Sequence, residues 1–157
     1  MKLPTGTVHT DFNSPIGRLL LAAHRGKLIG CWFEDQSNAP DLSALPRQPD
    51  EPVLVQAASQ LQDYLVGRRR NFDLPLDISS GTAFQQSVWQ ALTSLVYGGH
   101  CTYGDLARHI GRPAAVRAVG GAVGRNPLGI ILPCHRVLGA NGKLTGYTGG
   151  LGRKIAL

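Results

Sequence analysis

Apolar and polar residues alternate in the first third of the chain in a way that predicts three short β-strands. The apolar segments cover residues 8–12, 16–23 and 28–33, and turn-forming residues separate them at Asn13-Ser14-Pro15 and at Arg25-Gly26-Lys27. Connections this short favour antiparallel pairing of neighbouring strands. The pattern therefore predicts an antiparallel meander, followed over residues 34–51 by a loop rich in Pro, Asp, Ser and Asn.

A helix is predicted to begin at Pro52, a favourable first helical residue that follows two acidic residues, and to end at Gly67. Its apolar residues recur at helical spacing: Leu54, Ala57, Ala58, Leu61 and Leu65. Residues 71–81 then contain Pro, Ser and Gly without an apolar period. We place a domain boundary there and expect an N-terminal α/β domain over residues 1–78 and a second domain over residues 79–157.

Helix-start signals dominate the second domain. Thr82 with Gln85 and Thr102 with Asp105 both have the spacing of a capping box. The first helix is expected to run to Gly98-Gly99, the second to Gly111, and a third from Pro113 to about Gly124. Two short helices joined by a tight turn with glycine form a helix-turn-helix pattern. The whole chain is expected to have an α+β fold, with a small antiparallel sheet and a helix first and a mostly helical domain second.

The helix predicted over residues 113–124 is unusually bare. Val116, Val119 and Val123 form a narrow apolar stripe, and the other positions are mostly Ala and Gly, with Arg117 in the middle. A helix with normal side chains is about 10–12 Å across and the minor groove of B-DNA is about 6 Å wide, so only a slim helix approaches that groove closely. Small residues also permit tight packing between helices, and both interpretations stay open from this helix alone.

The segment Ile130-Ile131-Leu132-Pro133-Cys134-His135-Arg136-Val137 contains the candidate chemistry. Its three apolar residues predict a short buried strand, and the proline holds Leu132 extended before the cysteine. Cysteine reacts as a thiolate, so a histidine and an arginine directly after Cys134 suggest activation. Neighbouring side chains on a strand point to opposite faces, which predicts contact through a bridging water or a bend. The alternative is a buried cysteine beside a surface histidine.

Charge is unevenly distributed along the chain. Residues 1–80 contain 8 Lys and Arg against 9 Asp and Glu, a net charge of −1, whereas residues 81–157 contain 8 against 1, a net charge of +7. A basic half is typical of a surface that binds a polyanion, with nucleic acid as the expected partner, although a solvated basic face is the alternative.

Cysteine number and hydropathy suggest the compartment. The three cysteines, Cys31, Cys101 and Cys134, lack paired or C-x-x-C spacing, which argues for a reducing environment and against structural zinc. Because the sequence has neither a signal-peptide pattern nor a membrane-length apolar run, we expect a soluble cytoplasmic protein that binds no membrane.

The second half of the chain resembles the O6-alkylguanine-DNA alkyltransferases, also called methylated-DNA-protein-cysteine methyltransferases. The resemblance rests on motifs that follow one another in order over residues 82–157: Thr102-Tyr103-Gly104, Arg117-Ala118-Val119-Gly120, Asn126-Pro127, Pro133-Cys134-His135-Arg136-Val137 and Gly146-Tyr147-Thr148-Gly149-Gly150. Pro-Cys-His-Arg is the most specific of them. Residues 1–75 fit the family's variable N-terminal domain in outline.

This resemblance implies a role for each matching residue. Cys134 would accept the alkyl group, His135 would be its water-bridged base, and Asn126 would be a hinge between the recognition helix and the active-site strand. Arg117 would fill the gap left by the flipped guanine, and Tyr103 would act on the neighbouring phosphate and the flipped base. The remaining residues are contacts: Arg112, Arg125 and Ala118 with DNA, and Tyr147, Thr148 and the backbone at Val137 with the guanine.

The implied reaction is direct repair of duplex DNA at O6-alkylguanine, and at O4-alkylthymine, with base flipping. Because the product is a thioether, which water does not cleave, we expect one turnover per molecule and no cofactor. We also expect no metal site and a monomeric protein. In the family, a glutamate beyond the Gly-Gly-Leu segment orients the histidine, and this sequence ends at Leu157 before that position. Either the sequence is part of a longer chain or another group orients His135.

Three other classes fit parts of the sequence. A cysteine hydrolase would use Cys134 and a histidine but leaves Arg117 unexplained, and a transcription regulator would explain the helix-turn-helix but not the Cys-His pair. A protein that binds alkylated DNA without efficient transfer would explain everything except the cysteine itself.

Overall fold

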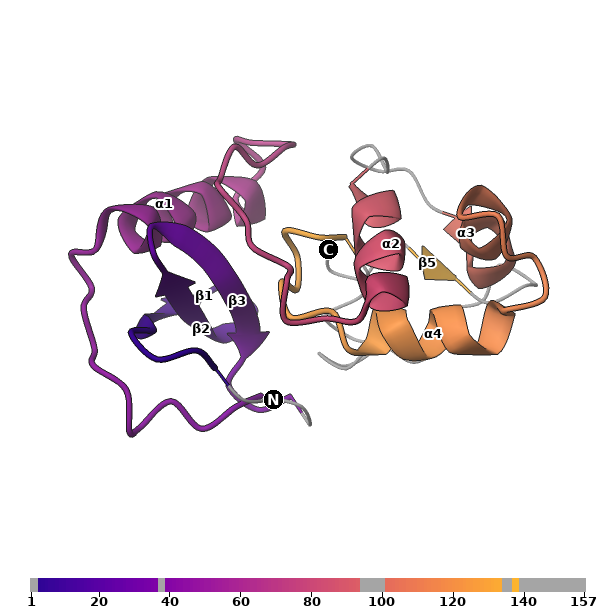
Figure 1. Cartoon of the computed structure of the whole chain (residues 1–157). Coiled ribbons are helices and arrows are strands. Elements are labelled where there is room, and N and C mark those ends of the chain that lie inside the picture. Colours follow the sequence, from indigo (N-terminus) through magenta and orange to yellow (C-terminus); the bar gives the residue numbers. More distant parts are fainter. Residues whose placement is uncertain (1–2, 37–38, 94–100, 134–136, 139–157) are drawn as a thin grey trace. The chain divides into compact units, whose positions relative to one another are not determined.

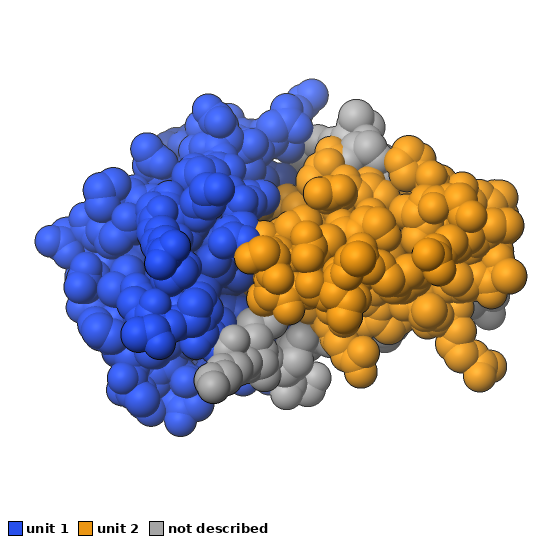
Figure 2. Space-filling view, in the orientation of Figure 1, with its two compact units in different colours: residues 1–77 blue, residues 78–157 orange. Residues whose placement is uncertain are grey.

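The computed structural model describes residues 3–36, 39–93, 101–133 and 137–138, and it divides into two compact units, residues 1–77 and residues 78–157 (Figure 2). The first unit contains the sheet and one helix, and the second contains the other helices (Figure 1). The predicted α+β fold is confirmed.

The first unit is an antiparallel meander of β1 (Val8–Ser14), β2 (Gly17–His24) and β3 (Lys27–Phe33), in the order β1-β2-β3. Arg25 and Gly26 have φ values of 52° and 76° in the turn between β2 and β3. Positive φ at both turn residues matches the twist of a two-residue hairpin, so the turn predicted here is confirmed together with the meander.

Helix α1 (Pro52–Leu65) packs on this sheet, as the apolar spacing predicted. Glu51 caps its N-terminus, since its carboxylate accepts a hydrogen bond from the Leu54 backbone at 3.0 Å. The buried side of the helix consists of Val53, Leu54, Ala57, Leu61 and Tyr64. Tyr64 thus joins the core, whereas Ala58 and Leu65 are only partly buried, because the sheet covers a narrower stripe than the sequence pattern suggested.

Both edges of the sheet are covered by irregular segments. On one side, the His9 backbone exchanges hydrogen bonds with Pro46 and Gln48, at 3.1 and 2.9 Å. On the other side, Leu28 bonds to Pro75 and Asp77, at 2.8 and 3.0 Å. Exposed strand edges are sites of unwanted pairing between chains, so these segments protect the sheet.

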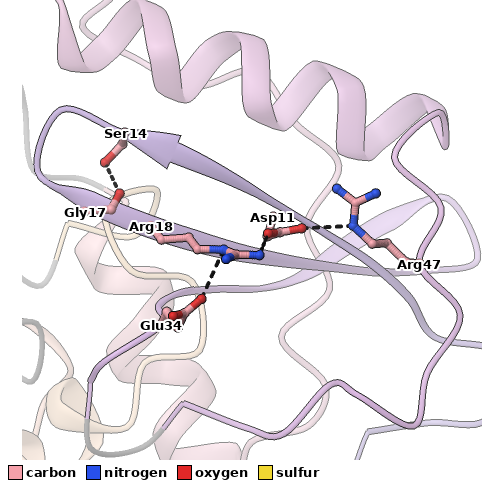
Figure 3. Close-up of polar contacts among 6 residues, drawn as sticks. All are labelled: Asp11, Ser14, Gly17, Arg18, Glu34 and Arg47. Carbon is pink, nitrogen blue, oxygen red and sulfur yellow. Dashed lines mark hydrogen bonds and ion pairs between the residues drawn. The ribbon is translucent and has the colours of Figure 1, made fainter.

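Ion pairs attach the long loop after β3 to the sheet (Figure 3). Asp11 in β1 pairs with Arg18 in β2, and its other carboxylate oxygen lies 3.0 Å from Nε of Arg47 in the loop. Nε of Arg18 also lies 3.0 Å from Oε2 of Glu34, at the start of that loop. Exposed pairs of this kind contribute little individually, about 0–1 kcal/mol, but together they fix where the loop lies.

The second unit contains α2 (Ala83–Leu92), α3 (Tyr103–His109) and α4 (Val116–Gly124), with two short strands, β4 (Cys101–Thr102) and β5 (Val137–Leu138), that pair in parallel. Both predicted capping boxes are present, at Thr82 and at Thr102. Trp89 is buried, and its indole N–H donates to the Ala122 carbonyl at 2.8 Å, which ties α2 to α4.

Two predicted helix boundaries in this unit are wrong, and one predicted core position is exposed. Helix α2 ends at Leu92 and not at Gly98-Gly99, which lie outside the described residues. Helix α4 begins at Val116 and not at Pro113, because residues 113–115 form a turn closed by a 2.9 Å hydrogen bond from Ala115 to Arg112. Val116 is therefore in the first turn of α4 and is 42% exposed, outside the buried stripe in which the sequence placed it.

A substitution at Gly30 tests the packing of the sheet. A Cβ atom at this position would overlap the buried ring of Trp32, two residues along the same strand. We expect Gly30→Ala to lower the free energy of unfolding by about 1–3 kcal/mol, as overpacked core substitutions do. Denaturant titration measures this change. The control is Gly121→Ala in α4, where a Cβ atom would meet no described residue within 4 Å beyond the helix's own backbone. This variant should gain up to about 1 kcal/mol in free energy of unfolding. Equal stabilities of the two variants would contradict the packing described here.

Candidate functional site

Helices α3 and α4 form the predicted helix-turn-helix. Gly111 has a φ of 76°, a conformation that glycine adopts easily, and the next backbone N–H, of Arg112, donates to the Ala107 carbonyl at 2.8 Å. This hydrogen bond closes the end of α3. The chain then turns through residues 113–115 into α4, and the two helices pack on each other.

One side of α4 is buried and the other is open and nearly bare. Val119, Ala122 and Val123 face the core, whereas Arg117, Ala118, Gly121 and Arg125 are exposed. Among the described residues, no atom apart from the helix's own backbone lies within 4 Å of the place where a Cβ atom of Gly121 or Gly124 would be. Tight packing between helices accounts for the buried small residue Ala122 but not for those on the open side, so this exposed face remains available to a partner.

Arginines lie near both ends of this exposed face. Arg112 precedes α4, and its guanidinium carbon lies 5.7 Å from the centre of the Phe84 ring, within the range of a cation–π contact. Arg125 follows the last residue of the helix and is exposed. Phe84, in the first turn of α2, is only partly buried, and its ring lies against the Arg112 guanidinium.

Tyr103 is the first residue of α3 and is partly buried. Its Cδ1 atom lies 3.9 Å from the position that a Cβ atom on Gly120 would occupy. The ring therefore lies against α4, and the structure brings Tyr103 to the same helix that carries Arg117.

Asn126, two residues after α4, is buried and fully engaged in hydrogen bonds. Its side-chain Nδ2 donates to the Leu132 carbonyl at 2.8 Å and, at the longer distance of 3.5 Å, to the Leu128 carbonyl, while Oδ1 accepts from the Leu128 N–H at 2.9 Å. One side chain thus holds the backbone that leads from α4 to Pro133. This arrangement is compatible with a hinge at this residue.

The apolar residues before Pro133 do not form the predicted strand. Residues 129–131 form a turn in which Leu132 donates to the Leu128 carbonyl at 2.8 Å and Ile130 has a φ of 71°. Positive φ is unfavourable for a β-branched residue. Burial of Ile130 and the hydrogen bonds of Asn126 hold it there, and a run of apolar residues reports burial without distinguishing a strand from a buried turn.

Four predicted site residues lie outside the described residues: Cys134, His135, Tyr147 and Thr148. Val137 lies in β5, where its backbone pairs with Cys101 in β4. The active-site segment is thereby connected on one side to Asn126 through residues 128–133, and on the other side to the strand that leads directly into α3.

Neither of the other two cysteines has the properties of an activated nucleophile. Cys31 is buried in β3. Cys101 is partly exposed, and desolvation, followed by the charge of Asp105, raises the pKa of its thiol, so it stays protonated at neutral pH. Among the described residues, no three His, Cys, Asp or Glu side chains come together as metal ligands.

Comparisons with known proteins agree with this arrangement along nearly the whole chain. The model of the 6-O-methylguanine DNA methyltransferase DNA-binding domain matches residues 83–157, and that of the ribonuclease-like domain of the same proteins matches residues 7–78. The chain belongs to the 6-O-methylguanine DNA methyltransferase family. The alkyl-transfer activity and DNA binding expected from the sequence are thereby confirmed for this methyltransferase.

Individual relatives are similar over most of their length. The methylated-DNA–protein-cysteine methyltransferase of Mycobacterium leprae is 47% identical over 147 residues, which is 94% of this chain and 87% of that one. The crystal structure of Mycobacterium tuberculosis O6-methylguanine methyltransferase superimposes with a TM-score of 0.88 at 45% identity, covering 96% and 90% of the two chains. The crystal structure of Mycobacterium tuberculosis OGT in complex with DNA superimposes with a TM-score of 0.87 at 44% identity, covering 94% of this chain and 88% of that one.

Some features of this methyltransferase could not be found from its sequence. The contact between Phe84 and Arg112 joins residues 28 positions apart, and no local pattern signals it. The pairing of β4 with β5 also cannot be predicted, because two-residue strands have no periodicity.

In the part of the chain that the structure describes, no helix is long and apolar enough to cross a membrane.

Replacing Asn126 tests its role in holding the segment before Cys134. Asn126→Ala leaves the buried Leu128 N–H and Leu132 carbonyl without partners, at a cost of about 1–3 kcal/mol for each unsatisfied group. We expect a lower midpoint in denaturant titration and slower alkyl transfer. The comparison variant is Asn126→Asp, which keeps the acceptor for Leu128 but loses the donor to Leu132. Full activity and stability in both variants would show that the amide is not required.

Proposed function

We propose that this methyltransferase repairs duplex DNA by transferring the alkyl group of O6-alkylguanine, and of O4-alkylthymine, to Sγ of Cys134, once per molecule. The alkyl carbon forms a bond to sulfur while its bond to O6 breaks, and the electron pair leaves with the guanine, which takes up a proton. The cysteine becomes a thioether. Since the thiol itself carries away the group, the reaction needs no cofactor.

The observation that best supports this proposal is the hydrogen bonding of Asn126. This side chain connects a slim, exposed, arginine-bearing helix to the backbone that ends at Pro133, the residue before Cys134. The exposed helix and the candidate nucleophile are therefore joined by a short, mostly buried segment that the Asn126 side chain holds by hydrogen bonds. Such a connection suits an enzyme that must place a cysteine beside DNA.

The exposed face of α4 suits the minor groove of the duplex. Ala118 and Gly121 allow close approach, and Arg112 and Arg125 would bind phosphates near the two ends of the helix. A base within the stack is out of reach of a thiol, so the damaged nucleotide must leave the duplex. Arg117 would occupy the vacated space, and Tyr103, adjacent to the same helix, would press on the neighbouring phosphate and donate a proton to the leaving base.

We assign the remaining predicted residues on the resemblance alone. His135 would generate the Cys134 thiolate through a bridging water, and Tyr147, Thr148 and the backbone at Val137 would surround the flipped guanine. We also propose that the protein acts as a monomer in the cytoplasm. The alternative function is binding of alkylated DNA without transfer of the alkyl group.

Mass spectrometry tests the acceptor directly. After incubation with a duplex that carries one O6-methylguanine, the peptide with Cys134 should gain one methylene unit, saturating at one per protein. Cys134→Ser should abolish this gain and leave DNA binding largely intact, because basic side chains supply most of the affinity. The matched control is Cys101→Ser, which should transfer normally. Transfer that survives in Cys134→Ser would rule out this acceptor, and selective binding without any transfer by the unaltered protein would indicate a damage-binding protein.

The role of Arg117 is tested by comparing two substrates. If Arg117 stabilises the duplex after flipping, a step that costs a few kcal/mol, Arg117→Ala should slow transfer from duplex O6-methylguanine by about 10–100-fold. Reaction with free O6-benzylguanine, which needs no flipping, should change less than about twofold. Single-turnover rates at saturating DNA measure both, with Arg68→Ala, at an exposed position of the first unit, as the control for loss of one positive charge. Equal losses on the two substrates would contradict the proposed role.

A further inference from the structure

Asp105 is the only acidic residue between positions 81 and 157, and it lies in the helix-turn-helix of a DNA-binding domain. Its side chain is 48% exposed. A carboxylate at this place repels the phosphates that the rest of the domain attracts. The question is what the residue contributes that offsets this repulsion.

The contacts of Asp105 are local and reciprocal. Its Oδ2 accepts a hydrogen bond from the Thr102 N–H at 3.0 Å, and its own N–H donates to Oγ1 of Thr102, also at 3.0 Å. Its second oxygen, Oδ1, pairs with Arg108 one turn later. The hydrogen bonds from Thr102, and then the charge of Arg108, lower the pKa of the Asp105 carboxyl, so the cap is charged at neutral pH.

Thr102 belongs to two elements at once. It is the last residue of β4, where it pairs with Leu138 of β5, and it is also the N-cap of α3. Tyr103 follows it as the first residue of α3. The two hydrogen bonds between Thr102 and Asp105 therefore fix the angle at which α3 leaves the strand that is paired with the active-site segment.

The ring of Tyr103 lies beside α4. Its Cδ1 atom lies 3.9 Å from the place where a Cβ atom on Gly120 would be, so this glycine leaves room for the ring next to the helix. The capping box fixes the backbone that carries the ring, and α4 lies on one side of it.

We propose that Thr102 and Asp105 are positioning residues, whose reciprocal hydrogen bonds hold Tyr103 in a fixed relation to β5 and α4. This inference rests on the proposed function, in which Tyr103 acts on the flipped nucleotide. Asp105 contributes the oxygen that accepts the Thr102 N–H, and its ion pair with Arg108 weakens the repulsion between its carboxylate and DNA.

Two substitutions at Asp105 separate charge from geometry. Asp105→Asn and Asp105→Ala remove the same negative charge, but only asparagine keeps an oxygen that can accept the Thr102 N–H. We expect Asp105→Ala to slow transfer from duplex O6-methylguanine about tenfold in single-turnover reactions at saturating DNA. Asp105→Asn should stay within about twofold of the unaltered protein. With free O6-benzylguanine, Asp105→Ala should lose less than with duplex DNA, because no base is flipped and Tyr103 can act there only as proton donor. Both variants should bind undamaged DNA somewhat more tightly.

A second pair of variants repeats the test from the other partner. Thr102→Val removes the hydroxyl but keeps a β-branched side chain suited to β4, and it should slow duplex transfer as Asp105→Ala does. Thr102→Ser retains the hydroxyl and should react at the normal rate. This pair also decides the question if Asp105→Ala does not fold. In a Tyr103→Ala background, Asp105→Ala should cause no further loss of duplex transfer, because the residue it positions is already absent.

The outcomes distinguish this inference from the proposed function. Equal rates for Asp105→Asn and Asp105→Ala would overturn the positioning role, as would additive losses in the Tyr103→Ala background. Matching losses on duplex DNA and free O6-benzylguanine that persist in the Tyr103→Ala background would show a general structural role instead. Absence of transfer by the unaltered protein would refute the proposed function itself.

Discussion

The buried amide of Asn126 is the interaction on which the arrangement of the second unit depends. A polar side chain in an apolar interior is stabilising only when its donors and acceptors are satisfied, and Leu128 and Leu132 satisfy both ends of this one. The same hydrogen bonds hold Ile130 at a positive φ that its side chain disfavours. The segment before Cys134 is therefore tied by hydrogen bonds to the residue that follows the end of α4.

Helix α4 shows how binding and stability compete within one element. Its glycines reduce intrinsic helix stability by about 1 kcal/mol each relative to alanine, so the helix depends on contacts with its neighbours. Val119 and Val123 provide apolar contacts, and the indole of Trp89 donates to the carbonyl of Ala122 from α2. Because one face supplies most of the anchoring, the opposite face is free to remain bare. A slim exposed surface is thus possible without loss of the helix.

The first unit is built from different interactions and carries none of the predicted site residues. Asp11, Arg18 and Arg47 connect two strands and the long loop, and backbone hydrogen bonds cover both edges of the sheet. These interactions stabilise the sheet and keep its edges from pairing with other chains. The basic charge, the helix-turn-helix and the candidate nucleophile all lie in the second half of the chain, as the division of charge along the sequence indicated.

The sequence by itself determined the features that depend on neighbours within about four residues. The strands, the Arg25-Gly26 turn and the capping boxes at Thr82 and Thr102 are of this kind, because their hydrogen bonds and φ requirements are local. Its motifs also identified the family. Tertiary structure alone decided the start of α4 at Val116, the turn at residues 129–131, the contact of Tyr103 with α4 and that of Arg112 with Phe84. Each of these features depends on a contact with a distant part of the chain. Apolar periodicity predicts that a residue is buried, but not which residue packs against it.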